Sequence, residues 1–76
     1  MEDLIKYIVE KITGTKDFSV EKQTDDERET YEISIAPDLI GMVIGKRGKT
    51  IRAIRKIVKI KAVLEDKSVN VNVKET

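Results

Sequence analysis

The sequence predicts an α+β fold whose elements follow the order helix, strand, strand, helix, helix, strand. Three observations predict it. Apolar residues recur at helical spacing in two long segments, three short segments alternate apolar and polar residues, and glycine or proline stands where several segments end. A chain of 76 residues has room for only one hydrophobic core, so we expect residues 1–76 to form a single domain.

The first element is a helix predicted over residues 2–13. Acidic residues occupy its first turn, and Gly14 stands just after the last apolar residue of the repeat, where a glycine commonly caps a helix. One face of this helix is expected to be buried, and its apolar residues are Leu4, Ile5, Ile8, Val9 and Ile12.

Two strands are predicted next, because apolar and polar residues alternate in two neighbouring segments. The apolar positions are Phe18 and Val20 in the first segment and Tyr31, Ile33 and Ile35 in the second. The polar run from Thr24 to Glu29 is expected to be the hairpin turn between them. Its acids are expected in a solvated loop, because the run lacks the ligand spacing and glycine hinge of a calcium site.

The second half of the chain predicts two helices and a last strand. Pro37 ends the second strand, so residues 38–44 are predicted as a short helix, and residues 49–65 form the longest one. We expect Gly41, inside the short helix, to allow close packing against a neighbouring element. The last strand has an apolar face formed by Val69, Val71 and Val73.

Between the two later helices lies a short loop with two glycines around two cations: Gly45, Lys46, Arg47 and Gly48. Glycine has no Cβ, so such a loop can adopt left-handed backbone angles and approach a ligand closely. The loop also leads into the N-terminus of the long helix, where free N–H groups favour an anion. We therefore predict that the loop cations and the backbone at Gly48 and Lys49 bind phosphates.

The distribution of charge supports this prediction more than the net charge of +1 does. Residues 1–37 carry a balance of −5, residues 38–64 a balance of +7, and residues 65–76 a balance of −1. A concentrated positive region attracts phosphates, while overall neutrality limits indiscriminate binding.

The long helix continues the positive region. No acid occurs between Lys46 and Lys61, and four cations share one stripe at spacings i, i+3, i+4 and i+7. An ordinary solvated face is the alternative, although such faces usually mix acids with bases. The cations of this stripe are Arg52, Arg55, Lys56 and Lys59. Arg52 is expected to contact the ligand together with the loop, and the other three are expected to form a secondary basic stripe.

The long helix also carries two apolar stripes, of which one suffices to cover a small sheet. The first contains Ile51, Ile54, Val58 and Ala62, and the second contains Ala53, Ile57, Ile60 and Leu64. Two alternatives stay open for the second stripe. It belongs to the core, or it is an exposed patch at Ile57, Ile60 and Leu64 that docks a second copy or another protein.

Several other functions are disfavoured. The tail Gly48-Lys49-Thr50 resembles that of a nucleotide-binding P-loop, but Val43 stands where that motif requires a glycine. The chain has no Cys and no His, and its serines lack a glycine-flanked elbow, so we expect no enzyme, no metal and no cofactor. We expect no membrane segment and no small-molecule substrate, and cytoplasm is the expected location.

The pattern Val43-Ile44-Gly45-x-x-Gly48-x-x-Ile51 resembles the signature of KH domains. The predicted order of elements resembles the type II KH arrangement, which implies three helices covering one face of a three-stranded sheet. The resemblance implies binding of single-stranded RNA, with the GXXG loop on the phosphates and the bases over Ile44 and Ile51.

Because the domain spans nearly the whole chain, the sequence resembles the small stand-alone bacterial KH proteins of the KhpA family. That resemblance implies an RNA chaperone or post-transcriptional regulator linked to cell-wall homeostasis and cell elongation. It also implies a homodimer, or a heterodimer with a larger KH protein. The alternative is a KH-like adaptor that binds protein and no nucleic acid, but such domains typically lose loop residues that this chain retains.

Overall fold

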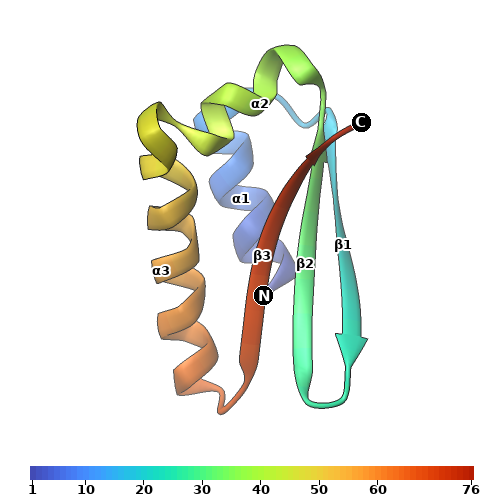
Figure 1. Ribbon diagram of the computed structural model, residues 1–76, viewed down its shortest axis with the longest axis vertical. Coiled ribbons are helices and arrows are strands. Elements are labelled where there is room, and N and C mark those ends of the chain that lie inside the picture. Colours follow the sequence, from blue (N-terminus) through green and yellow to red (C-terminus); the bar gives the residue numbers. More distant parts are fainter.

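The computed structural model describes all residues, 1–76, and has the predicted order of elements (Figure 1). One short 3₁₀ helix, η1, is added between the last two helices. The elements are α1 (Glu2–Thr13), β1 (Phe18–Asp25), β2 (Arg28–Ile35), α2 (Pro37–Ile44), η1 (Lys46–Gly48), α3 (Lys49–Leu64) and β3 (Ser68–Glu75).

The three strands form one sheet in the order β1-β2-β3. Strands β1 and β2 are antiparallel, with Phe18 opposite Ile35, whereas β2 and β3 are parallel, with Tyr31 opposite Val71. A parallel pair needs a crossover connection, which α2, η1 and α3 provide. The crossover leaves β3 at an edge of the sheet, alongside α3.

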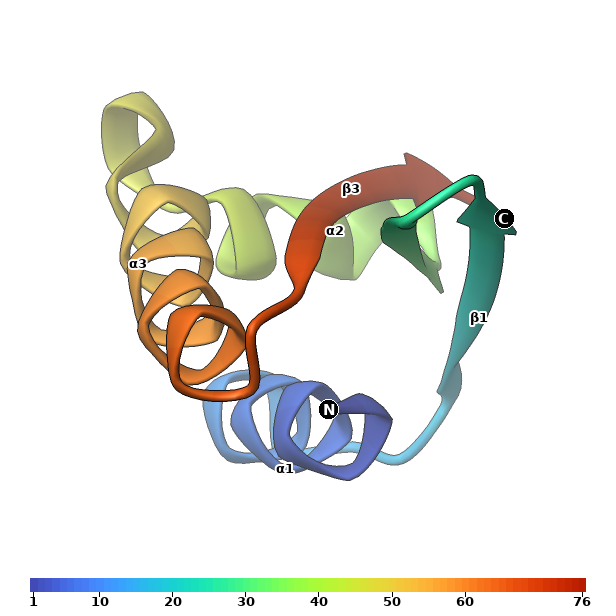
Figure 2. The same ribbon diagram turned by 90° about the horizontal axis from the view of Figure 1, so that it is seen from below.

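The two long helices, α1 and α3, pack on the same side of the sheet, as Figure 2 shows from below. The shorter helix α2 crosses one end of the sheet and contacts α1, α3 and β3 (Figure 1). The α+β class and the three-stranded sheet are therefore confirmed. The expected cover of three helices is confirmed in part, because two helices lie along the sheet and α2 closes its end.

The core lies between the sheet and the helices. Its most buried side chains, at 0 to 1% exposure, come from all three helices and the central strand: Ile5, Val9, Ile33, Ile35, Val43, Ile54 and Val58. Burying a side chain of this kind stabilises a fold by about 1.5–3 kcal/mol. The first apolar stripe of α3 thus belongs to the core, and it fixes which face of α3 points outward.

The predicted hairpin turn from Thr24 to Glu29 is wrong in its extent. Strand pairing continues to Asp25 opposite Arg28, so only Asp26 and Glu27 form the turn, and Asp26 has a positive φ of 54°. Two-residue hairpin turns require such left-handed angles, which Asp tolerates better than most residues. Most of this polar run therefore belongs to the paired strands β1 and β2 and not to a loop.

The acids of this run were expected to be solvated, and this expectation is wrong for Glu29. Its exposed fraction is only 7%. The alternation of β2 places it on the same side of the sheet as Tyr31. Its carboxylate lies 3.4 Å from the Nζ of Lys22 and 3.9 Å from the Nζ of Lys67, which compensates its burial. Burial, together with the neighbouring charge of Glu29, raises the pKa of the Tyr31 hydroxyl.

Of the predictions for the two glycines outside the loop, one is confirmed and the other is wrong. Gly14 caps α1 in a left-handed conformation with φ 74°, as predicted. The expectation for Gly41 is wrong, because no atom lies within 4 Å of the position that a Cβ would occupy there. Gly41 is exposed on α2 and packs against nothing.

None of the helices is long and apolar enough to cross a membrane.

Candidate nucleic-acid interface

The loop between α2 and α3 depends on a backbone conformation that only glycine adopts readily. Gly45 has φ 76° and ψ 172°, a region essentially restricted to glycine. A Cβ at this position would collide with the side chain of Thr50 and would lie 2.8 Å from its backbone nitrogen. The loop can therefore fold back tightly onto the start of α3, and the Gly45 N–H still caps α2 by donating to the Gly41 carbonyl at 2.8 Å.

The residues after Gly45 turn the two cations away from the protein. Arg47 has φ 57° and ψ 27°, a left-handed conformation that is uncommon for a residue with a side chain. An Nη2 hydrogen of Arg52 is donated to the Arg47 carbonyl at 3.0 Å, which braces this turn. Lys46 and Arg47 are both exposed. Arg52, predicted as a direct nucleic-acid contact, thus has a clear structural role in holding the loop.

Gly48 precedes α3 with φ 74° and ψ 16° and is its N-cap. No side chain caps this helix end, and no acid occupies its first turn. The first N–H groups of α3 therefore lack the side-chain acceptors that commonly satisfy them, at the end where the helix dipole is positive. The Gly48 N–H already donates to the Gly45 carbonyl at 3.1 Å, and the Lys49 N–H donates to the Lys46 carbonyl. An anion placed against Gly48 and Lys49 would therefore be favoured by the positive end of the helix dipole.

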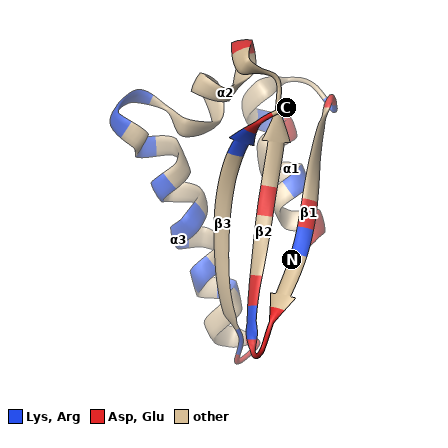
Figure 3. Ribbon diagram, turned by 45° about the vertical axis from the view of Figure 1, so that its right-hand side comes forward, with Lys and Arg blue, Asp and Glu red and all other residues tan.

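The positive region shows a further property that the sequence could not reveal. Seven of its eight cations have no acid within ion-pair distance, and the eighth, Lys61, pairs with Glu65. Outside the region, Lys6, Lys16, Lys22, Lys67 and Lys74 each have an acid within ion-pair distance. The unpaired cations of the region are Lys46, Arg47, Lys49, Arg52, Arg55, Lys56 and Lys59, and outside it only Lys11 and Arg28 have no ion pair. Figure 3 shows the distribution of charge behind this contrast, with Lys and Arg along α3 and most of the acids on the strands and the hairpin. Unpaired, exposed cations remain available for an external anion.

The predicted base-contacting residues differ in exposure. Ile44, at the end of α2, is 37% exposed, while Ile51 is 7% exposed and belongs to the core cluster. Of this pair, only Ile44 offers a substantial apolar surface next to the loop. Ile51 instead anchors the first turn of α3 to the core.

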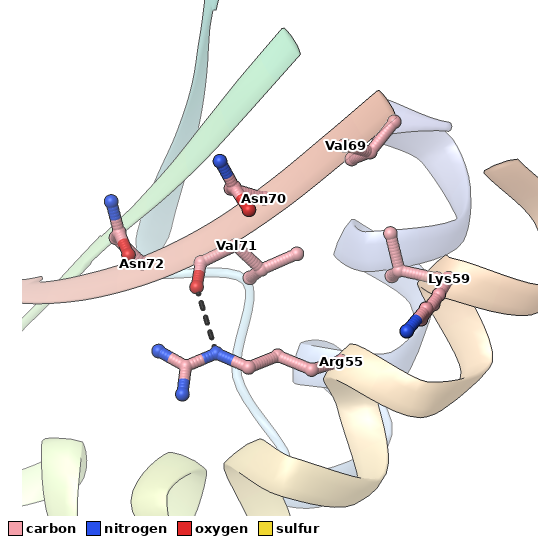
Figure 4. A pocket seen from close by; sticks show the side chains of 7 residues that line it. Arg55, Lys59, Val69, Asn70, Val71 and Asn72 are labelled. Atoms are coloured by element: carbon pink, nitrogen blue, oxygen red, sulfur yellow. Dashed lines mark hydrogen bonds between the residues drawn. The ribbon is translucent and has the colours of Figure 1, made fainter. Parts of the chain in front are cut away.

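The sequence did not predict a groove between α3 and β3, which begins beyond the loop (Figure 4). Arg55 and Lys59 line it from α3, and Val69 and Val71 line it from β3. The Nε–H of Arg55 donates to the Val71 carbonyl at 3.0 Å. The alternation of valines and asparagines in β3 is visible in the sequence. The position of β3 at the sheet edge, beside α3, is not.

The second apolar stripe of α3 is exposed, which rules out the alternative that it belongs to the core. Ile57 is 45%, Ile60 64% and Leu64 82% exposed, and Val63 extends the patch at 68%. These residues lie on the side of α3 that faces away from the core. We refer to Ile57, Ile60, Val63 and Leu64 as the outer patch.

A glycine loop between the second and third helices, in the order αββααβ, is the arrangement of a KH domain. The family model described as KhpA/KhpB, KH domain, matches residues 2–73. The chain therefore belongs to the KhpA/KhpB KH-domain family.

Relatives that align over nearly the whole chain carry the name RNA-binding protein KhpA. The protein of Clostridium acetobutylicum is 34% identical over 74 residues, which cover 96% of this chain and 99% of the relative. The Clostridium perfringens protein is 32% identical over 74 residues with the same coverage of each chain. The protein of Caldanaerobacter subterraneus subsp. tengcongensis is 34% identical over 74 residues, again covering 96% and 99%.

Proposed function

We propose that this protein binds single-stranded RNA, with the loop Gly45–Gly48 holding the phosphate backbone. The observation that carries the proposal is the set of seven unpaired cations around an uncapped helix N-terminus and a loop that only glycine can form. The relatives named RNA-binding protein support it.

In the proposed complex, phosphates lie against the backbone at Gly48 and Lys49, at the positive end of α3, and between the side chains of Lys46 and Arg47. The bases then lie over Ile44 and extend toward the groove between α3 and β3. Single-stranded RNA suits this arrangement, because its unstacked bases can turn into a groove while the backbone stays on the loop. Lys56 and Lys59 extend the positive surface along α3.

A protein adaptor without nucleic-acid binding is the second candidate function, and it accounts for less of the surface. Seven neighbouring cations without acids repel one another, and a protein-docking surface has no need of them at the loop. The outer patch is a separate surface that can dock a protein while the loop binds RNA. The two functions therefore do not exclude each other, and RNA binding explains the loop.

Salt dependence is the first test of the proposed function. If about four phosphates are neutralised on a single strand, log affinity is expected to fall with log salt concentration with a slope of about −3. Fluorescence anisotropy with an unstructured, labelled oligoribonucleotide at several KCl concentrations measures it. A slope near zero, or no binding at low salt, would favour the adaptor.

By likeness to the KhpA family, we propose that RNA binding serves an RNA chaperone or a post-transcriptional regulator in the cytoplasm. The same likeness links the protein to cell-wall homeostasis and cell elongation. Residues 1–76 act as one KH domain in this proposal. A single domain with about four phosphate contacts binds weakly at cellular salt, so a second binding site in the same assembly would raise the effective affinity.

We propose that this second site comes from another copy of the chain, docked through the outer patch. Ile57, Ile60 and Leu64 follow spacings of three and four residues, with Ala53 one turn earlier, which is the pattern of a helix–helix seam. Two such helices related by a twofold axis would cover each other's apolar residues. A larger KH protein with a similar helix could take the place of the second copy.

Replacing Ile60 by Asp is expected to yield a folded monomer, because Ile60 is 64% exposed and outside the core. Burying the new charge in the seam would weaken self-association by at least about tenfold. Sedimentation velocity measures the oligomeric state, and circular dichroism checks the fold. Tyr7→Asp is the matched control, since Tyr7 is an exposed apolar residue of α1, at 60%, far from the outer patch in sequence. A wild-type monomer at micromolar concentration would contradict self-association.

A further inference from the structure

The side chains of the groove between α3 and β3 offer a ligand more hydrogen-bond donors than acceptors. Its volume is about 400 Å³, and its floor includes Val58, Val69 and Val71. Arg55 and Lys59 enter from α3, while Asn70 and Asn72 lie along the strand (Figure 4). The amides of the asparagines point away from Arg55 in Figure 4, so the polar side chains that enter the groove, Arg55 and Lys59, carry only donors.

The hydrogen bond from Arg55 to Val71 increases this excess of donors over acceptors. Strand β3 lies at the edge of the sheet, and an edge strand normally presents free carbonyl and N–H groups. The Val71 carbonyl is the acceptor that points from this edge toward α3, and the Nε–H of Arg55 occupies it at 3.0 Å. An amine group entering the groove at this point therefore finds one of the two lone pairs of this carbonyl already in use and the Arg55 donors beside it.

The same bond positions the rest of the Arg55 guanidinium. Neither of its terminal nitrogens has a hydrogen-bond partner in the protein, and no acid lies within ion-pair distance. With Nε held on the strand, the planar group presents its outer N–H donors in a fixed orientation (Figure 4). A pair of adjacent acceptors is the partner that fits these donors.

We propose that Arg55 is a specificity-determining residue that makes the groove select guanine over adenine. This inference rests on the proposed binding of single-stranded RNA, which brings a base into the groove. Guanine offers two adjacent acceptors, O6 and N7, which an arginine commonly contacts in a bidentate manner. Adenine has an amine in place of O6, and that amine would meet the N–H donors of Arg55 with no acceptor between them.

The test compares octamers of uridine that carry one central guanine, adenine or 7-deazaguanine, measured by fluorescence anisotropy at low salt. Wild-type protein is expected to bind the guanine octamer about tenfold more tightly than the adenine octamer. Replacing N7 by carbon in 7-deazaguanine is expected to remove most of that preference, because one of the two acceptors is lost.

Arg55→Lys provides the matched variant, because it retains the charge and loses the planar fork. The preference of the variant for the guanine octamer, taken as the ratio of its two affinities, is expected to fall to about twofold or less. Equal binding of guanine and adenine by wild type, or a preference that survives in Arg55→Lys, would overturn the inference and leave RNA binding intact. Absence of binding to all three octamers would overturn the proposed function, and this inference with it.

Discussion

The double substitution Lys46→Asp and Arg47→Asp is expected to abolish measurable binding of single-stranded RNA. Two attractions to phosphate become two repulsions, and unit charges about 4 Å apart interact by about 1 kcal/mol even in bulk water. The combined loss predicts at least about a hundredfold lower affinity at low salt. Aspartate is the suitable replacement, because it tolerates the left-handed conformation that Arg47 adopts.

The fold is expected to survive this change, because Lys46 and Arg47 are exposed and make no side-chain hydrogen bond or ion pair. Anisotropy measures the affinity, and circular dichroism confirms folding. The double substitution Lys6→Glu and Lys11→Glu on α1 is the control, since it changes the net charge by the same amount away from the loop. Equal losses in both double variants would mean that net charge, and not the loop, governs binding.

The second large effect is expected for Gly45→Ala, which tests the loop geometry itself. Alanine must adopt a backbone conformation essentially restricted to glycine, and its methyl group collides with Thr50. We expect the free energy of unfolding to fall by about 3 kcal/mol and the melting temperature by at least about 10 °C. RNA binding is expected to be lost in the fraction that folds, because the loop must open.

Two other glycines provide controls for this prediction. Gly48 has a left-handed φ, but its nearest neighbour to a new Cβ is the Ile51 Cγ2 at 4.0 Å, so Gly48→Ala should cost only about 1–2 kcal/mol. Gly41 has open space and a helical position, so Gly41→Ala should stabilise the protein by up to about 1 kcal/mol. Thermal unfolding followed by circular dichroism ranks the three variants. A cost for Gly45→Ala no larger than that for Gly48→Ala would contradict the account of the loop.

The order of the helices and strands could be predicted from the sequence because each long element repeats its apolar residues at its own period. The hairpin could not, because pairing of polar residues depends on the neighbouring strand and leaves no apolar signal between Thr24 and Glu29. Burial of Glu29 depends on lysines brought from β1 and from the segment before β3. Such compensation between distant residues is not visible in a local pattern.

The candidate site divides in the same way. The glycines and cations of the loop are consecutive residues, so their grouping could be read directly from the sequence. The bond from Arg55 to Val71 joins residues 16 positions apart, and it depends on how α3 lies against the edge of the sheet. The role of Arg52 as a brace for Arg47 was missed for a similar reason, since the left-handed turn at Arg47 changes where the loop carbonyls point.

Amide chemical shifts measured by NMR during a titration with an unstructured oligoribonucleotide test the central claim most directly. At low ionic strength, we expect the largest shifts at residues 45–49, with smaller ones along the groove at Arg55 and Val71. The amides on the hairpin at Asp26 and Glu27 should stay in place. Shifts confined to the hairpin or the outer patch, with residues 45–49 unmoved, would contradict the proposal that this loop holds the RNA backbone.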